Sequence, residues 1–539
     1  MKKSGSFKVL CMFTALSILF AITPVNLPAD AEEINQYVSL CIGYRKAIQN
    51  GIETTIDKEG SKPFILNGRT MIPLRFVSEK MGAKVTYVSQ SEPITVVYKP
   101  TDTTVTFTLN SKKMTITTGK NKKTVTIDTP AQIKNGRTFI PLRAIGQALG
   151  FQVYYDDATK IIIVSNPKMT ATIKKNRIDE AKKKIRGDLL IGQKAEKIKN
   201  KMTLDEKIYQ LFFVTPESIT GVKTVTQAGD TTKKALKSYP VGGIIYFSAN
   251  IKTCSQVSDM ISKTQSYSKT PLFIGVDEEG GRVARISGNP QMGFEKIDAM
   301  EKIGKTGDPK KSYAVGKKIA ANISPLGFNV DFAPVADIIT NPKNTEIGDR
   351  SFGKDPELVS RMIEQQVLGL QAHGIGAALK HFPGHGSTQA DTHKGYSESF
   401  RTLKELRATE FLPFQAGIQA GADFVLMSHM SLVHVNKSKI PASLSKKIVT
   451  DILKTELSFN HLVITDSLSM GAITSRYTSA QTAVMALEAG VDMLLMPKNL
   501  KDAFAAIKAA VASGKISEKR IDESVLKILQ VKIDRNIIQ

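Results

Sequence analysis

The chain has 539 residues, more than one ordinary domain holds, so two or more folded units are expected. Hydrophobic residues make up 41% of it, with 38 glycines and 22 prolines, a composition that is typical of globular proteins and excludes disordered, collagen-like and coiled-coil chains. Lysine and arginine number 74 against 50 acidic residues, a formal net charge of +24, and three cysteines are too few for a disulfide scaffold.

The N-terminus has the pattern of an export signal. Basic residues precede an apolar stretch from Val9 to Ile22, and Ala29-Asp30-Ala31 has the small-x-small form of a signal-peptidase site. The sequence therefore predicts a signal peptide over residues 1–31, a secreted or cell-wall-associated protein, and no stable membrane insertion after cleavage. A membrane anchor is the alternative, but the apolar stretch is short for a transmembrane helix.

If the protein is exported, only some anionic partners are available to its positive charge. An exported basic protein meets the anionic polymers of the cell envelope, which attract it over a long range. No motif typical of DNA- or RNA-binding proteins is visible in the sequence. We therefore expect an anionic cell-wall polymer as a partner, and not nucleic acid.

An internal repeat organises the first third of the chain. Residues 67–75 read NGRTMIPLR and residues 135–143 read NGRTFIPLR, an offset of 68 that Gly82 and Gly150 share. In each copy an Asn-Gly turn leads into a short strand, and a helix is expected to begin at the proline of the motif and to end at the shared glycine. Further strands are predicted at 38–42, 105–109 and 114–117.

This repeat resembles the copper amine oxidase N-terminal module, over about Gln36 to Ser165, and we assign residues 36–166 to it. The name of that module suggests copper, but all seven histidines lie between His373 and His461, so the repeat contains no imidazole ligand. A wall-associating or spacing role is the expectation.

A basic segment follows the repeat. Residues 167–201 carry 12 lysine or arginine residues against 4 acidic ones, a net charge of +8. Apolar residues recur at roughly helical spacing, which predicts a basic helical linker.

The remaining chain, residues 202–539, alternates apolar runs with helical stretches. The runs are continuous and do not alternate with polar residues, as expected of strands buried on both faces. This repetition predicts an α/β domain with a TIM-type (β/α)8 barrel, and a doubly wound sheet is the alternative. Seven strands are expected, at 242–247, 271–277, 329–335, 376–382, 423–429, 461–466 and 491–496.

Polar side chains stand at the ends of these runs. Asp277, Lys380-His381, His429 and Asp466 each close a run, and Asp337 follows closely behind another. Active sites of barrels are assembled at the C-terminal ends of the strands. The pattern therefore predicts an enzyme.

The segment from Lys380 to Ser399 is the densest in candidate chemistry. Asp391 and His393, two residues apart on an extended loop, can form a dyad in which the carboxylate orients the imidazole and raises its basicity. A zinc site is the alternative from the residues alone, with the ligands His381, His385, Asp391 and His393.

Five motifs in order resemble the β-N-acetylglucosaminidase branch of glycoside hydrolase family 3. The similarity runs from about Met202 to the C-terminus, and the resemblance implies a barrel that removes terminal β-linked N-acetylglucosamine with retention, using an aspartate nucleophile and a His-Asp dyad. The motifs are MTLDEKIYQLF (202–212), VDEEGGRVARI (276–286), IGDRSFGKDP (347–356), KHFPGHG (380–386) with the following Asp391 and His393, and VITDSLSM (463–470).

The resemblance also implies roles for individual residues. Asp466 becomes the nucleophile, His393 the proton donor and acceptor, and Asp391 the residue that orients His393. Glu278 and Glu279 are expected to position other groups. Substrate binding falls to Asp277, Arg285, Arg350, Lys380 and His381.

The expected function is that of an exported β-N-acetylhexosaminidase acting on peptidoglycan-derived or related glycans. The resemblance implies no metal and no cofactor. A β-glucosidase or an N-acetylglucosaminide phosphorylase is the alternative within the class, since a histidine donor repels incoming phosphate less than a carboxylate would. A zinc hydrolase and a wall-binding protein with an inactive barrel are the alternatives from other classes.

Overall fold

The computed structural model describes residues 36–44, 46–50, 52–57, 61–89, 92–134, 136–157, 160–166, 171–388, 397–436 and 439–539. The predicted signal peptide, Asp391 and His393 lie outside these residues. The chain divides into two compact units between Gly187 and Asp188, and each is considered by itself.

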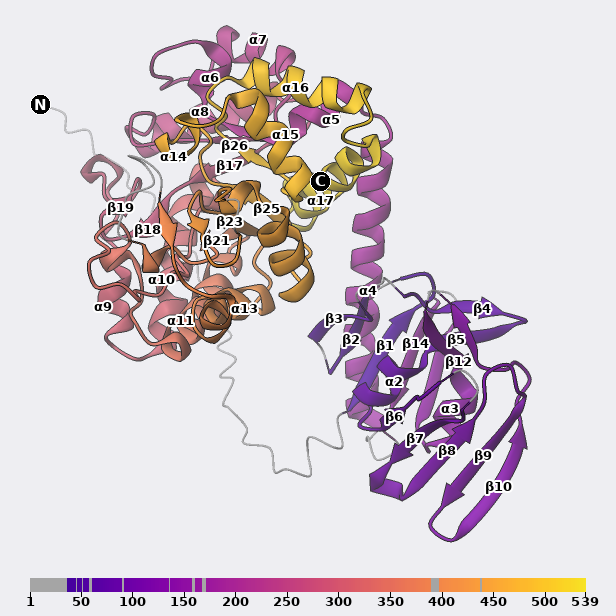
Figure 1. Cartoon of the computed structure of the whole chain (residues 1–539). Helices are drawn as coiled ribbons and strands as arrows, with labels where there is room; N and C mark the ends of the chain where they lie inside the picture. Colours follow the sequence, from indigo (N-terminus) through magenta and orange to yellow (C-terminus); the bar gives the residue numbers. More distant parts are fainter. Residues whose placement is uncertain are drawn as a thin grey trace, which may run out of the picture. The chain divides into compact units, whose positions relative to one another are not determined.

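The described part of the first unit contains three antiparallel sheets (Figure 1). One has the order β13-β14-β1-β2-β3, the second β10-β9-β8-β7-β6, and the third β11-β12-β5-β4. The strands are β1 (Tyr37–Cys41), β2 (Lys46–Gln49), β3 (Ile52–Thr55), β4 (Phe64–Leu66), β5 (Arg69–Pro73), β6 (Lys84–Thr86), β7 (Ile94–Tyr98), β8 (Thr103–Phe107), β9 (Lys113–Thr118), β10 (Asn121–Thr126), β11 (Gln132–Lys134), β12 (Arg137–Pro141), β13 (Gln152–Asp156) and β14 (Ile161–Ser165).

The two sequence repeats meet at the centre of the four-stranded sheet. β5 and β12 pair antiparallel with Ile72 opposite Ile140, two residues that are 68 apart. Each strand leads into a short helix, α2 (Leu74–Lys80) or α3 (Leu142–Ala148). The motif prolines stand at the N-cap and not, as expected, at the first helical position, because the strand continues through the proline.

Helix α4 (Ala171–Lys199) occupies most of the segment predicted as a helical linker. The boundary between the two units falls within it. Its last turns belong to the second unit, where Ala195 is fully buried in the apolar cluster of the barrel.

The second unit is a closed barrel of eight parallel strands. Their order is β25-β23-β21-β20-β17-β16-β15-β26, and a parallel bridge between Ile464 and Met493 closes the ring. The strands are β15 (Phe212–Val214), β16 (Gly243–Ile245), β17 (Phe273–Val276), β20 (Val330–Asp331), β21 (Gly376–Phe382), β23 (Phe424–Met427), β25 (Leu462–Thr465) and β26 (Leu494–Leu495). The predicted TIM-type fold is therefore confirmed.

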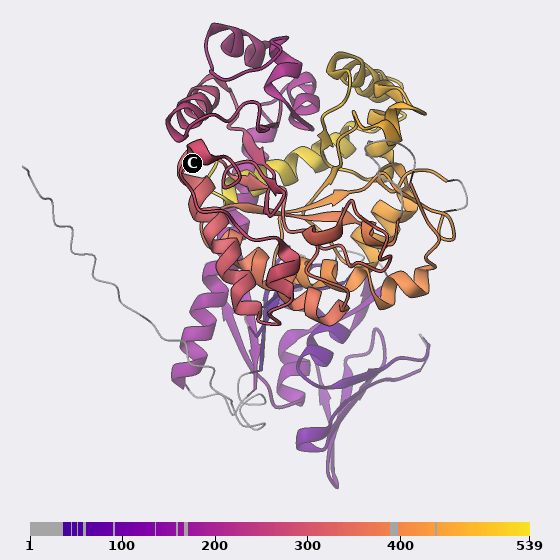
Figure 2. The same cartoon turned by 90° about the vertical axis from the view of Figure 1, so that its left-hand side faces the viewer.

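Helices surround the strands of the barrel (Figure 1, Figure 2). Helices α10 and α11 both begin with an Asp-Pro pair whose aspartate accepts a hydrogen bond from the second residue of the helix. The helices are α5 (Leu204–Gln210), α6 (Pro216–Thr220), α7 (Asp230–Ser238), α8 (Cys254–Tyr267), α9 (Met300–Gly304), α10 (Pro309–Ile323), α11 (Pro356–Gln371), α12 (Leu403–Ala408), α13 (Phe411–Gln419), the π-helical segment η7 (Lys447–Glu456), α14 (Gly471–Thr474), α15 (Ser479–Ala489), α16 (Leu500–Ala512) and α17 (Glu518–Asp534).

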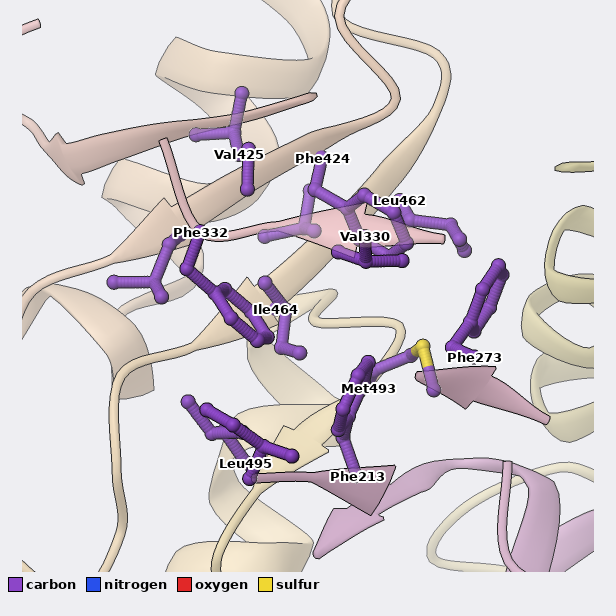
Figure 3. Packing of buried hydrophobic residues seen from close by; sticks show 14 of the residues in the cluster. Phe213, Phe273, Val330, Phe332, Phe424, Val425, Leu462, Ile464, Met493 and Leu495 are labelled. Carbon is purple, nitrogen blue, oxygen red and sulfur yellow. The ribbon is translucent and has the colours of Figure 1, made fainter. Parts of the chain in front are cut away.

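Side chains from most of the strands fill the barrel (Figure 3). Phe213 of β15 stacks on Phe273 of β17 at 6.3 Å between ring centroids and meets Phe332 edge-on at 5.3 Å. The interior is thus a packed core rather than a pore. This leaves the ends of the strands as the place for a site.

One barrel strand, β15, was not predicted from the sequence. β15 (Phe212–Val214) is only three residues long and begins one residue after Leu211, the C-cap of helix α5 (Leu204–Gln210), so its apolar run is too short to stand out as a strand. Among the described residues, no helix combines the length and the hydropathy needed to cross a bilayer.

Candidate active site

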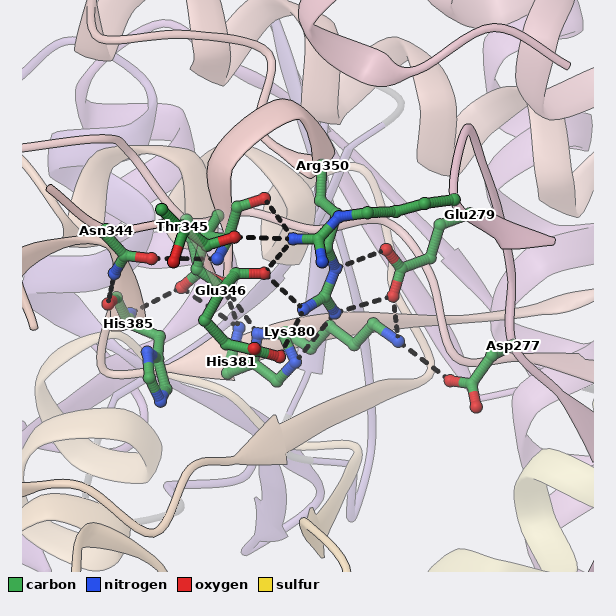
Figure 4. Close-up of polar contacts among 12 residues, drawn as sticks. Asp277, Glu279, Asn344, Thr345, Glu346, Arg350, Lys380, His381 and His385 are labelled. Atoms are coloured by element: carbon green, nitrogen blue, oxygen red, sulfur yellow. Dashed lines mark hydrogen bonds and ion pairs between the residues drawn. The ribbon is translucent and has the colours of Figure 1, made fainter. Parts of the chain in front are cut away.

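The predicted site residues within the described chain gather at the C-terminal end of the barrel. Asp277 directly follows β17, Asp466 directly follows β25, and Lys380 and His381 close β21. Arg350 ends the short 3-10 helix η4 (Gly348–Arg350), from the loop between β20 and α11. Figure 4 shows Asp277, Arg350, Lys380 and His381 converging.

A chain of ion pairs fixes the cationic side of this site. Arg350 donates from Nε and one terminal nitrogen to both carboxylate oxygens of Glu279, at 2.8 and 2.9 Å. Lys380 Nζ lies 2.6 Å from Glu279 Oε1 and 2.9 Å from Asp277 Oδ1. The Glu279 side chain is only 2% exposed, so it holds both cations in place from inside the protein, while Asp277 remains 17% exposed.

The opposite charges in this chain of ion pairs stabilise one another. Burial alone would raise the pKa of Glu279, but Lys380 and Arg350 hold it well below its ordinary value. Burial likewise opposes the charge of Lys380, yet Asp277 and Glu279 raise the pKa of its ammonium. Glu279 and Lys380 are therefore ionised at neutral pH, and removing one would leave buried charge uncompensated.

Arg285 lies at the edge of this chain of ion pairs, next to Asp277. One of its terminal nitrogens is 3.8 Å from Asp277 Oδ2, longer than a hydrogen bond, and its side chain is 27% exposed. Its buried Nε has no hydrogen-bond partner within the described residues. The Arg285 guanidinium is thus not fixed by a hydrogen bond to Asp277.

A second cluster lies around the carboxylate of Asp337. Asp337 is fully buried and accepts hydrogen bonds from His381 Nδ1 at 2.7 Å and from the backbone N–H of His385 at 2.6 Å. Burial would raise the pKa of Asp337, but His381 and His385 hold it below its usual range. On the other side of the imidazole, a guanidinium nitrogen of Arg350 lies 3.4 Å from Nε2. His381 is therefore fixed between a carboxylate and a cation.

Asp466 is held at the end of β25 by its backbone. Its N–H donates to the carbonyl of Met427 on β23 at 2.8 Å, and its Oδ1 accepts from Ser467 N–H at 2.7 Å. Burial would raise the pKa of Asp466, but His381 and His429 hold it below its ordinary value, with a further contribution from Ser467. The side chain is partly exposed and ionised at neutral pH, as a carboxylate nucleophile requires.

His429 fixes the turn behind Asp466. Its Nε2 donates to the carbonyl of Ser467 at 2.9 Å, and its Nδ1 lies 2.8 Å from the hydroxyl of Ser443. The sequence marked His429 and Asp337 as residues near strand ends but assigned neither a role. The signal was their position, and what the sequence could not show was which neighbour each would bind.

The two glutamates that follow Asp277 hold different groups in position. Glu279 binds Lys380 and Arg350, whereas Glu278 accepts hydrogen bonds from Ile286 N–H at 2.7 Å and Ser287 N–H at 2.9 Å. Glu278 therefore holds the hairpin of β18 (Glu278–Gly280) and β19 (Val283–Ala284) that carries Arg285.

The predicted proton donor His393 and its partner Asp391 lie outside the described residues, between Thr388 and Ser397. Within the described residues, no group of three or more histidine, cysteine, aspartate or glutamate side chains is placed to hold a metal ion. The predicted zinc ligands include two residues outside that range.

The barrel and its charged mouth define a (β/α)8-barrel enzyme. The model of the glycosyl hydrolase family 3 N-terminal domain matches residues 203–531, and the chain belongs to that family. The copper amine oxidase N-terminal domain matches residues 25–96 and 60–164. Both resemblances inferred from sequence motifs are thereby confirmed.

The proteins that the barrel resembles are described as beta-hexosaminidases or as a beta-N-acetylglucosaminidase. The chain is 31% identical over 326 residues to beta-hexosaminidase A of Pseudoalteromonas piscicida, covering 55% of this chain and 54% of that protein. It is 35% identical over 276 residues to a beta-hexosaminidase of Stenotrophomonas maltophilia, covering 50% and 80%. A glycoside hydrolase family 3 beta-N-acetylglucosaminidase from Paenibacillus sp. str. FPU-7 superposes with a TM-score of 0.59 at 36% identity, over 62% of this chain and 63% of that one.

Proposed function

We propose that this protein is an exported, retaining β-N-acetylhexosaminidase that removes terminal β-linked N-acetylglucosamine from peptidoglycan-derived or related glycans. The observation that carries the proposal is Asp466, an ionised carboxylate at a barrel strand end, within electrostatic reach of Lys380 and His381. Relatives described as beta-hexosaminidases support the choice of sugar.

In the proposed reaction Asp466 attacks the anomeric carbon and forms a covalent glycosyl-enzyme as the glycosidic bond breaks. His393, oriented by Asp391, donates a proton to the leaving oxygen and then takes one from the water that hydrolyses the intermediate. Two displacements at one carbon restore the original configuration, so the enzyme is expected to retain it.

The ion-pair chain suits recognition of the sugar. The Asp277 side chain is 17% exposed, and its carboxylate can accept hydroxyl hydrogens. Lys380 and Arg285 can donate around it, and His381 can donate or accept. Because Glu279 holds Lys380 and Arg350 in fixed positions, these donors need little reorganisation when the sugar binds.

The first test compares hydrolysis of an aryl N-acetyl-β-glucosaminide with that of the matching glucoside, each with and without phosphate. We expect preference for the N-acetylated sugar and free N-acetylglucosamine as product. A sugar phosphate as the main product would make the enzyme a phosphorylase, and preference for the glucoside would make it a β-glucosidase.

Export and substrate need separate measurements. The predicted signal peptide and the net positive charge support an extracytoplasmic location, and the expected result is a mature chain beginning after Ala31 in the wall or medium fraction. Release of N-acetylglucosamine from muropeptide-derived fragments tests the peptidoglycan assignment against chitin oligosaccharides of equal length.

A further inference from the structure

The five-stranded sheet β10-β9-β8-β7-β6 (Figure 1) has one buried and one exposed face. One face packs into the apolar core of the first unit. The other is partly or fully exposed along all five strands. The buried apolar residues on the core side are Val85, Ile94, Val96, Tyr98, Val105, Phe107, Met114 and Ile116.

The exposed face carries two rows of side chains that run straight across the sheet. The strand register places five threonines opposite one another, one from each strand, and places a second row beside them with a lysine at each end. The first row is Thr86, Thr95, Thr106, Thr115 and Thr124, and the second is Lys84, Val97, Thr104, Thr117 and Lys122.

The rows form a surface that is rich in hydroxyl groups. With neighbouring strands about 4.8 Å apart, each row is about 19 Å long, and the rows are about 7 Å apart. Thr115 and Thr124 already lie within 3.3 Å of each other through their hydroxyls. Threonine suits exposed strands by propensity alone, but that preference does not explain why a lysine stands at each end of the row beside the five threonines.

The charge of this face has one sign. None of the ten residues in the two rows is acidic. Residues 84–127, which contain the whole sheet, include 7 lysines and 2 acidic residues. Lys84 and Lys122 stand at opposite ends of a row about 19 Å long, so no small anion can touch both.

We propose that this face, the threonine–lysine face of strands β6 to β10, binds an extended polyol phosphate chain laid across the strands. The lysines act as point charges for phosphate groups, as ammonium groups do where bidentate geometry is not required. The threonine hydroxyls between them donate to phosphate oxygens and accept from polyol hydroxyls. This binding is independent of hydrolysis by the barrel.

The test uses the full chain and poly(glycerol phosphate) as the probe. Lys122→Glu reverses a charge on the face, and Lys123→Glu makes the same change on the neighbouring residue, whose side chain belongs to the opposite side of the strand. We expect Lys122→Glu to weaken binding about tenfold and Lys123→Glu to weaken it by less than about threefold, because the charge is screened and lies off the face.

A second variant tests the hydroxyls. Thr106→Val combined with Thr115→Val keeps the shape and strand propensity but removes two donors at the centre of the first row. A loss of several-fold is expected, with hydrolysis of an aryl glycoside unchanged in every variant.

Three outcomes would overturn the proposal. The first is no binding of poly(glycerol phosphate) by the native chain. The second is an equal loss with Lys122→Glu and Lys123→Glu, which would mean unspecific attraction by net charge. The third is equal affinity for polygalacturonate or for neutral dextran of the same length, which would mean that phosphate is not recognised.

Discussion

The Nδ1 atom of His381 lies 2.7 Å from the Oδ2 atom of Asp337, a carboxylate that also accepts the backbone N–H groups of His381 and His385. One buried anion therefore sets both the ring orientation of His381 and the path of the backbone that follows it. In the proposed function Asp337 is a positioning residue, because it would act on substrate through His381.

Asp337→Asn keeps the size of the side chain but replaces one acceptor oxygen by a donor. Since hydrogen bonds to charged groups are worth about 1.5–3 kcal/mol, we expect kcat/KM to fall about 10- to 100-fold. A shift in the pH profile of kcat/KM would separate this role from simple destabilisation. Ser351→Ala is the control, because Ser351 Oγ donates to the Asp337 carbonyl and does not contact the imidazole. Unchanged kinetics in Asp337→Asn would contradict the positioning role.

Glu279→Gln is expected to destabilise the barrel strongly. The change leaves Lys380 and Arg350 buried without their shared carboxylate, and breaking a buried pair in this way costs about 3 kcal/mol or more. Denaturant unfolding monitored by circular dichroism measures the loss. Glu301→Gln, in the exposed pair with Lys305, makes the same chemical change and should alter stability by less than about 0.5 kcal/mol. Equal effects would show that the Glu279 pairs are not structural.

The positions of the strand-end residues could be predicted because a strand buried on both faces gives a continuous apolar run. Asp277, Lys380 and Asp466 stand where such runs stop, so the topology alone brings them to one end of the barrel. The same logic failed for β15 (Phe212–Val214), which is too short to be distinguished from the helix before it.

The partners inside the site could not be predicted. Glu279 and Arg350 are 71 residues apart, and Asp337 and His381 are 44 apart. Their pairing depends on how two loops fold over the barrel end, which no local periodicity encodes. The predicted dyad of Asp391 and His393 remains a prediction from sequence.

The barrel should become more stable as the pH rises above 7, because Lys532 is buried in the folded state. This lysine is fully buried on α17, donates to Gln210 Oε1 at 2.9 Å, and lies 5.0 Å from the Phe273 ring. Burial lowers the pKa of Lys532 to about 7. Between that pH and about 10.4, where an unfolded lysine titrates, the unfolded chain binds the additional proton. The free energy of unfolding therefore increases with pH in this window, by at most about 1.4 kcal/mol per pH unit, and the gain is lost as the pH falls to 7.

Lys532→Met should remove that slope. The unfolding midpoint of the variant between pH 7 and 10 should change less with pH than that of the native chain, and the variant should gain most, relative to the native chain, at pH 7. Lys519→Met on the exposed start of the same helix is the control and should leave the slope unchanged. A native slope retained in Lys532→Met would refute the assignment.

The barrel should be active without the first unit, because every matched catalytic motif lies beyond residue 201. A chain of residues 202–539 is expected to hydrolyse an aryl N-acetylglucosaminide, but to unfold at a lower temperature than residues 188–539. The longer chain keeps the buried Ala195 and the pairs of Lys199 with Glu196 and Asp522. A folded but inactive 188–539 chain would show that catalysis needs the first unit.

The last prediction separates His393 from Asp466. Cleavage of a natural disaccharide needs protonation of the leaving oxygen, whereas a nitrophenolate leaves with little assistance. His393→Ala should therefore lose roughly 100- to 10,000-fold on the disaccharide and much less on the aryl glycoside. Asp466→Ala should lose rate on both substrates alike, because no glycosyl-enzyme forms without the nucleophile.

Asp391→Asn should behave as a weaker His393→Ala, since the carboxylate orients the imidazole and stabilises its charge. Steady-state kinetics of the three variants on both substrates, with circular dichroism to confirm folding, gives the comparison. If His393→Ala slowed both substrates equally while Asp466→Ala stayed largely active, the two roles would have to be reassigned, and the ionised Asp466 at the end of β25 would be a structural carboxylate instead.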